Sequence, residues 1–238
     1  MKILITNDDG IMADGIVRLA KAAKEFGEVW VVAPASQRSA ASHSISLHNA
    51  IDVYPATDFP VEGVHAYSCS GTPGDCVRVG SLSVMPYKPD VVLSGINYGF
   101  NAASDIQYSA TAGAAFEAAF QGYHGIALSE GCNCTEATDK YLKVILRELL
   151  EEDIEPGFIH NVNFPDCKGD ECKGVLYNRK VSRGMFYKDH YNEVEHLKNG
   201  GIRYMVEGVY TPEAEEDTDF HAILNNYVSV GVVNNVGY

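Results

Sequence analysis

The stretch ITNDDGI, residues 5 to 11, places two adjacent carboxylates directly after an apolar run. Just upstream, residues 2 to 6 (KILIT) have the apolar character of a buried strand. Downstream, residues 14 to 26 (DGIVRLAKAAKEF) repeat apolar side chains at helical spacing, and residues 29 to 34 (VWVVAP) are continuously apolar, as parallel strands often are. This part of the chain therefore predicts a strand, a helix and a parallel strand, with paired acids where the first strand ends.

The same alternation of strands and helices continues to about residue 165. Further strands are expected at residues 65–69, 90–95, 125–129 and 158–164. A helix is expected to start at Pro73, with Thr72 as its N-cap and Asp75 at N3. Two more helices are expected, at residues 109–122 and 135–153. The alternation favours an α/β fold with a mostly parallel sheet.

The pattern changes from about residue 166. Residues 175–182 and 201–210 look like longer strands, and the charged stretch KDHYNEVEHLKNGG between them predicts a hairpin outside the parallel sheet. A short helix within residues 211–226 and a last strand at 227–233 complete the chain. We therefore expect a single domain, residues 1–238, divided into an α/β core (1–165) and a projecting carboxyl-terminal extension that serves oligomerisation (166–238).

Composition limits the classes of function. The chain has 238 residues, 46% of them hydrophobic, and a net charge of −14, so a long nucleic-acid partner is not expected. No apolar stretch approaches the ~20 residues that cross a bilayer, and the amino terminus lacks a signal-peptide core, so we expect a cytoplasmic protein without a membrane partner. The six cysteines include no paired CxxC motifs with nearby histidines, so neither structural zinc nor disulfides are expected.

Polar side chains follow several of the predicted strands. Asp8 and Asp9 follow the first strand, Ser39 lies in the loop after the second, and Asn97 lies in SGINYGFN after the strand at 90–95. Ligands of open parallel sheets bind beyond the carboxyl ends of the strands, so we expect these groups to converge. Adjacent carboxylates repel each other, and an oxygen-only set suits one divalent cation, Mg, Mn or Ca.

Each of these residues also has a structural alternative. The paired aspartates are also able to cap the following helix or form an Asx-turn, and Ser39 is of a type common in turns. Asn97 and Asn101 are of a type that tolerates left-handed backbone conformations. His43 is a candidate proton donor to a leaving group, although a lone histidine is more often structural.

The stretch SATAG, residues 109 to 113, is expected to open a helix just after the Asn-rich loop. Free N–H groups at a helix amino terminus bind phosphate, and the hydroxyls of Ser109 and Thr111 offer further contacts, although ordinary N-capping is an even alternative. No GxGxxG or GxxxxGK[ST] motif is present, which argues against a dinucleotide site and a P-loop.

These motifs together carry a family resemblance. The chain resembles the SurE family of metal-dependent nucleotidases through ITNDDGI, VVAPASQRSAASHSISL, GTPGDCV, DVVLSGINYGFN, YSATAGAAFEA, NVNFP and DTDFHAI, in that order and over nearly the whole chain. The resemblance implies a Rossmann-like three-layer core, a projecting carboxyl-terminal hairpin and a swapped homodimer or tetramer. It also implies a nucleoside monophosphate substrate, a metal held by Asp8, Asp9, Ser39 and Asn97, and phosphate contacts from Asn101, Ser109 and Thr111.

Two positions depart from the family pattern. Ala40 stands where the family usually has the glycine of RSG, and Ala110 stands where it usually has the glycine of YSGT. If the backbone at either position needs a positive φ or a close approach to the phosphate, alanine in place of glycine lowers phosphate affinity. We expect ordinary backbone, in which Ala110 stiffens the start of the helix.

The predicted activity is hydrolysis of a phosphomonoester by in-line attack of a metal-activated water, with Asp8 and Asp9 as catalytic residues. Selectivity is expected from residues 40–60 and from the projecting arm of a neighbouring subunit, where Tyr187, His190 and Tyr191 are candidates to stack on a base. The alternatives are a zinc deacetylase, which needs His ligands that are absent beside NDDG, and a non-catalytic nucleotide-binding regulatory protein.

Overall fold

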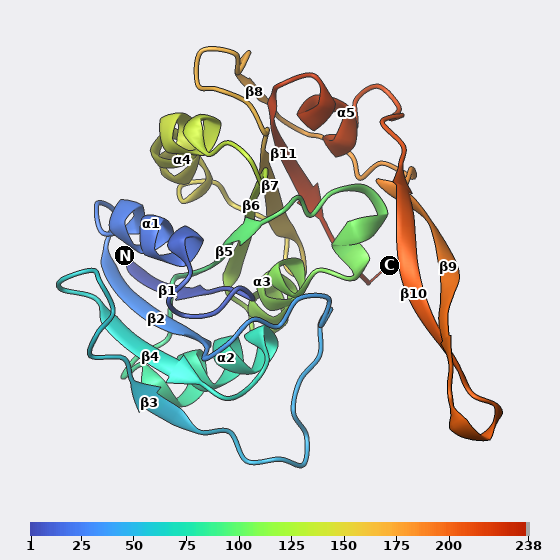
Figure 1. Ribbon diagram of the computed structural model, residues 1–238. Coiled ribbons are helices and arrows are strands. Elements are labelled where there is room, and N and C mark those ends of the chain that lie inside the picture. The colour runs from blue at the N-terminus through green and yellow to red at the C-terminus, as the bar shows by residue number, and fades with distance from the viewer. Residues whose placement is uncertain (237–238) are drawn as a thin grey trace.

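The computed structural model describes residues 1–236, and its first strand, β1 (Lys2–Thr6), lies in the interior of the main sheet. Successive side chains of a strand point to opposite faces, and β1 is apolar on both. Ile3 and Ile5 belong to the main core cluster on one face, and Leu4 belongs to a second cluster on the other. A strand that is buried on both faces requires helices on both sides, which is the three-layer arrangement seen in Figure 1.

The main sheet has nine strands in the order β3-β4-β2-β1-β5-β6-β7-β11-β8. Their bounds are β3 Val53–Pro55, β4 His65–Cys69, β2 Glu28–Pro34, β5 Val91–Tyr98, β6 His124–Glu130, β7 Ile159–Phe164, β11 Val228–Val233 and β8 Val175–Leu176. The pairs from β4 to β7 are parallel, whereas β3 and β11 run antiparallel to β4 and β7. The predicted fold class, α/β with a mostly parallel sheet and a projecting hairpin, is confirmed.

The order of the strands reverses beside β1. The chain moves outward through β2 and β4 on one side of β1 and through β5, β6 and β7 on the other. Loops that leave the carboxyl ends of β1 and β5 therefore diverge, and a crevice opens between them.

Four helices cover the two faces. Helices α1 (Asp14–Ala23) and α4 (Glu136–Leu149) contact each other on one face, and α2 (Pro73–Val79) and α3 (Ala110–Phe120) contact each other on the other (Figure 1). Helix α2 begins as predicted, because Thr72 Oγ1 accepts from the Asp75 amide and the Asp75 carboxylate accepts from the Thr72 amide.

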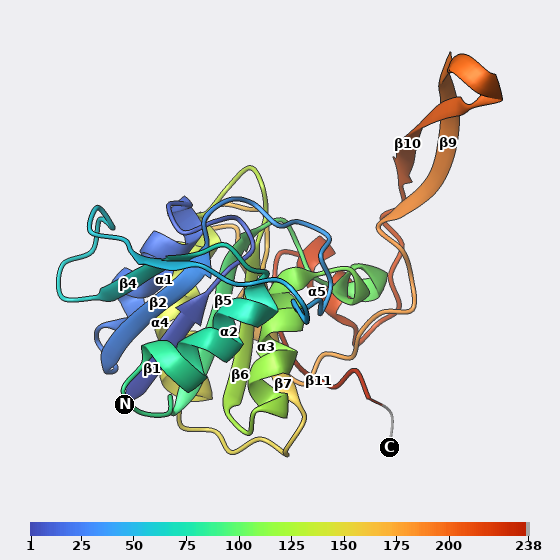
Figure 2. The ribbon, with the colours of Figure 1, turned by 90° about the horizontal axis from the view of Figure 1, so that it is seen from below.

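The hairpin consists of β9 (Tyr187–His196) and β10 (Ile202–Tyr210), which pair only with each other among the described residues. It projects away from the core in both ribbon views (Figures 1 and 2). The prediction of its first strand was wrong: residues 175–182 supply only the short β8, and the charged stretch predicted as a connection is β9 itself. Every residue of β9 is exposed, so the strand has no buried face to produce an apolar alternation.

The last elements return to the main sheet. Helix α5 (Asp219–Leu224) contacts β11, and β11 lies between β7 and β8. The hairpin is therefore inserted between two segments that both belong to the core. No helix in residues 1–236 combines the length and the apolar character that spanning a bilayer requires.

Candidate functional site

The polar residues singled out in the sequence meet at the carboxyl edge of the sheet. The loops after β1, β2 and β5 and the start of α3 surround a cavity of about 620 Å³. Its wall includes five of the predicted site residues, Asp8, Ser39, Asn97, Asn101 and Ser109. The topological rule that placed them together is satisfied, because the cavity lies at the switch point between β1 and β5.

Asp8 is the buried member of the carboxylate pair, with 4% of its surface exposed. Its Oδ1 accepts a hydrogen bond of 2.6 Å from Thr111 Oγ1 on α3. Burial raises the pKa of Asp8 to about 6, the Thr111 hydrogen bond opposes that rise, and the neighbouring charge of Asp9 adds to it. The carboxylate thus lies in a position where a cation would stabilise its charged form.

Asp9 lies beside the cavity and is connected to two loops. Its Oδ2 accepts from the Tyr98 amide at 3.0 Å, and its Oδ1 accepts from Gln37 Nε2 at 3.4 Å. Burial raises the pKa of Asp9, and these two hydrogen bonds lower it. The paired acids are therefore attached to the loops that carry Asn97 and Ser39.

Side-chain amides orient both Ser39 and Asn97: the amide of Gln37 contacts Ser39, and Asn97 is held through its own amide. Gln37 Nε2 donates to Ser39 Oγ at 3.0 Å, and the same amide reaches Asp9. Asn97 Nδ2 donates to the Gly99 carbonyl at 2.7 Å, which leaves its Oδ1 as an available acceptor. Gln37 was missed by the sequence analysis, since nothing in an exposed polar loop indicates which side chain bridges two others.

Ser109 is the N-cap of α3. Its Oγ accepts from the Ala112 amide at 3.0 Å, so the N-capping alternative is correct, and the residue still lines the cavity. The remaining free N–H groups of the first turn make this end of α3 suitable for an anion.

Asn101 is held by a buried polar network. Its Nδ2 donates to Ser129 Oγ at 2.7 Å, and its backbone N–H donates to Asn163 Oδ1 at 2.8 Å. Asn161 and Asn163 in β7 both donate to its carbonyl. The sequence signal for this support is the alternation NVN within a buried strand, where polar side chains on one face need partners.

Thr111 and His43 occupy other positions. Thr111 is fully buried, donates to Asp8 and does not line the cavity. His43 Nε2 lies 2.8 Å from Glu117 Oε2, and Glu117 also binds Arg78. His43 lines a different, smaller cavity, so its structural alternative is the one that the contacts favour.

The two alanines that replace family glycines differ in backbone conformation. Ala110 is the first residue of α3 and is helical, as expected. Ala40 has a φ of 55°, in the left-handed region, so the expectation of ordinary backbone was wrong there. Ala40 lines the cavity next to Ser39, and a side chain in this conformation costs about 1 kcal/mol or more.

The base of the hairpin closes one side of the cavity. Tyr187, Asp189 and Tyr191 alternate along β9 and line the cavity, as does Val206, which pairs with Tyr191. His190 is not among the wall residues, and its Nε2 lies 3.3 Å from Glu207 of β10. Two of the three aromatic candidates for base binding therefore face the cavity of their own chain.

The donor set fits a hard cation better than zinc. Neither Asp8 nor Asp9 has a basic side chain among the groups that shift its pKa. Within residues 1–236 no group of three or more His, Cys, Asp or Glu side chains is arranged to hold a metal. A cation here would be bound by two carboxylates, a hydroxyl and an amide oxygen, which is the chemistry of Mg, Mn or Ca sites.

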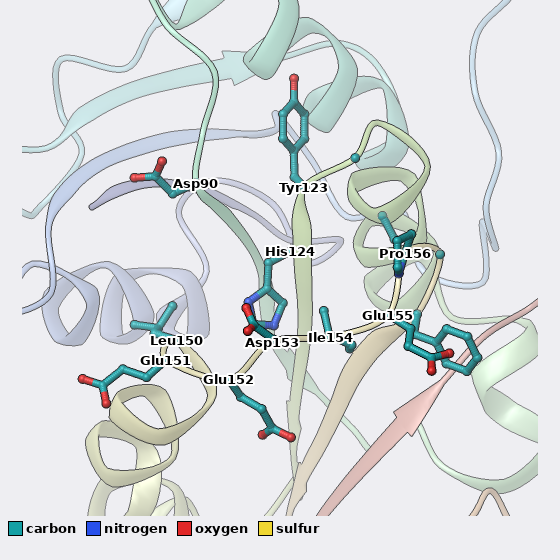
Figure 3. Close-up of a pocket in the computed structure, with 14 residues that line it drawn as sticks. Asp90, Tyr123, His124, Leu150, Glu151, Glu152, Asp153, Ile154, Glu155 and Pro156 are labelled. Carbon is teal, nitrogen blue, oxygen red and sulfur yellow. The ribbon is translucent and has the colours of Figure 1, made fainter.

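A second cavity, of about 380 Å³, lies at the opposite edge of the sheet, where β6 and β7 begin (Figure 3). Its wall carries His124 and several acids, including Glu152 and Asp153. Burial lowers the pKa of His124 to about 4, so the ring is neutral at pH 7 and supplies no positive charge. This cavity is unsuited to a phosphate.

The fold and the site define a class: α/β proteins with a cavity lined by oxygen-bearing side chains at the carboxyl edge of a mostly parallel sheet. The family model described as Survival protein SurE matches residues 3–186, and the chain belongs to the SurE family.

Similar proteins cover nearly the whole chain. The 5'-nucleotidase SurE of Pelobacter propionicus is 37% identical over 239 residues, covering 97% of this chain and 92% of that protein. The 5'-nucleotidase SurE of Clostridium botulinum (strain Loch Maree / Type A3) is 38% identical, with 97% and 91% covered. The crystal structure of the SurE protein from Aquifex aeolicus superposes with a TM-score of 0.83 at 33% identity, covering 98% of this chain and 92% of that one.

Proposed function

We propose that the protein is a metal-dependent phosphomonoesterase that hydrolyses nucleoside monophosphates to a nucleoside and inorganic phosphate. The observation that carries the proposal is the buried carboxylate of Asp8, next to Asp9, without a basic partner and close to the start of α3. The 5'-nucleotidase names of the similar proteins support the same activity.

The proposed metal ligands are Asp8, Asp9, the Ser39 hydroxyl and Asn97 Oδ1. Their support is the convergence of three loops on one cavity and the hydrogen bonds that orient the side chains. A bound divalent cation would neutralise substrate charge and lower the pKa of a coordinated water. In a protein with a net charge of −14, that neutralisation is needed before an anionic ester can approach.

The chain's own residues have separate roles in this mechanism. Ser109, Asn101 and the free N–H groups of α3 bind the phosphate oxygens and stabilise the charge that develops on them. Asp8 or Asp9 orients the attacking water and accepts its proton as the water adds to phosphorus. The bond from phosphorus to the sugar oxygen breaks on the opposite side, and that oxygen takes a proton from solvent. Thr111 acts through Asp8, whose carboxylate it holds in place.

The testing experiment is a phosphate-release assay over a panel of mononucleotides, with each divalent metal added to chelator-treated protein. We expect release from at least one mononucleotide with Mg or Mn, and none after chelation. Binding of mononucleotides without release under any metal would support the regulatory alternative and overturn the proposal.

We also propose that the β9–β10 hairpin forms the contact of a homo-oligomer. A two-stranded ribbon has little stability on its own, and this one exposes the apolar side chains of Val194, Met205 and Val209. Light scattering should give a mass of two or more chains, and Met205→Lys should lower it. A monomer at micromolar concentration would contradict this assembly.

A further inference from the structure

The cavity at the candidate site continues toward the base of the hairpin. A neighbouring cavity of about 450 Å³ shares four wall residues with it, Gly99, Phe100, Asp105 and Tyr187. Among residues 1–236, no Lys or Arg lies in either wall. A molecule bound with one end at Asp8 would therefore extend into acidic and aromatic surroundings.

Asp105 is the acid common to both cavities. It lies in the short 3₁₀ helix Ala103–Gln107, and among the described residues its carboxylate accepts only from Ser104 Oγ, at 3.4 Å. Burial raises the pKa of Asp105, and the charge of Asp189 on β9 raises it further. The carboxylate is thus half-buried, poorly satisfied and available to a ligand.

Asp189 approaches from the hairpin. It lies between Tyr187 and Tyr191 on the face of β9 that lines the cavity, because alternate residues of a strand share a face. Opposite it in register is Gly208, where a Cβ atom would lie 3.0 Å from Asp189 Oδ1, so the glycine leaves room for the carboxylate. Two acids from separate elements therefore face one space that also has aromatic walls.

Carboxylates without cationic partners repel a phosphate and accept hydrogen bonds from hydroxyl groups. Aromatic faces stack on nucleobases. We propose that Asp105, assisted by Asp189, forms a sugar subsite, in which carboxylates accept hydrogen bonds from ribose hydroxyls while the base lies against the aromatic wall. This inference rests on the proposed function, because it takes the phosphate end at Asp8 as given.

The first test uses binding of nucleosides, which carry no phosphate. Calorimetry on the metal-free protein should show adenosine binding about tenfold more tightly than at least one of 2′-deoxyadenosine and 3′-deoxyadenosine. Asp105→Asn should weaken adenosine binding by about tenfold and remove that discrimination, since the acceptor loses its charge. Glu62→Gln removes an equal charge from an exposed turn outside both cavity walls and should change neither.

The second test uses hydrolysis. Asp105→Asn should raise the KM for AMP by about tenfold, whereas hydrolysis of p-nitrophenyl phosphate should stay within about twofold, because that ester has no sugar. Equal losses on both substrates, no adenosine binding, or a loss of Mn²⁺ binding in Asp105→Asn would each overturn the sugar subsite. If the wild type hydrolyses no monoester, the proposed function fails, and nucleoside binding still decides the subsite.

Discussion

Thr111 Oγ1 donates a hydrogen bond of 2.6 Å to Asp8 Oδ1, and this contact joins helix α3 to the end of strand β1. The two residues are 103 positions apart in the chain. The contact connects the end of the sheet that carries the acids to the helix that carries the free N–H groups. The contact therefore fixes the proposed cation site next to the proposed phosphate site.

Thr111→Val should remove this hydrogen bond and keep the volume of the side chain. A hydrogen bond to a charged group contributes about 1.5–3 kcal/mol, so metal affinity at neutral pH should fall about tenfold or more. Titration calorimetry with Mn²⁺ would measure the change. Thr111→Ser keeps the hydroxyl and should retain most of the affinity; equal loss in both variants would indicate a packing effect instead.

Asp9→Asn should abolish phosphate release while leaving the fold intact. Asp9 is only partly buried, and an amide retains its size while removing a negative charge from the ligand set. We expect turnover to fall by at least about a hundredfold, with an unchanged circular dichroism spectrum. Wild-type turnover in purified Asp9→Asn would exclude this residue from the site.

Gln37→Ala should weaken metal binding through the ligands that Gln37 orients. Its amide donates to both Ser39 Oγ and Asp9 Oδ1, and loss of such supporting contacts typically costs tenfold or more in metal affinity. The matched control is Gln107→Ala, because the Gln107 side chain makes no hydrogen bond within residues 1–236. Equal affinity of the two variants would show that Ser39 and Asp9 need no such support.

Ala40→Gly should stabilise the protein, whereas Ala110→Gly should destabilise it. Ala40 has a φ of 55°, which glycine adopts without the steric cost of a Cβ atom. Ala110 is helical and fully buried, so glycine there loses both helix propensity and packing. We expect shifts of about 0.5–1 kcal/mol in opposite directions, measured by urea unfolding. Shifts of the same sign would contradict the strain at Ala40.

Acid should destabilise the protein through His124 and His160. The two rings are joined by a hydrogen bond of 2.9 Å, and burial lowers the pKa of each to about 4 from an unfolded value of 6.5. Between these values the unfolded chain binds more protons, so stability falls as pH falls from about 6.5 toward 4. His124→Gln should flatten this slope in thermal unfolding, and exposed His48→Gln should not. Equal slopes in the wild type and in His124→Gln would show that these two histidines do not cause the acid destabilisation.

The periodicity of apolar residues was sufficient to predict the buried strands at the core of the sheet. Residues such as Ile3, Leu4 and Val31 are apolar because they are buried, so the pattern of burial can be read locally. The topological rule for parallel sheets then predicts from the sequence that Asp8, Ser39 and Asn97 lie at one edge of the sheet. Strand β9 had no such signal, because its side chains are exposed on both faces.

Contacts between distant residues depended on tertiary packing. Thr111 faces Asp8 because α3 packs against β5 and β6 with its first turn beside the residues that follow β1. The sequence motif alone was equally consistent with a hydroxyl in the cavity. Asp105 and Asp189 share a cavity because the hairpin returns past the 3₁₀ helix. The sequence determines which residue types are present. The direction in which each side chain points follows from the packing of whole helices and strands, and the energy of that packing depends on contacts between residues far apart in the chain.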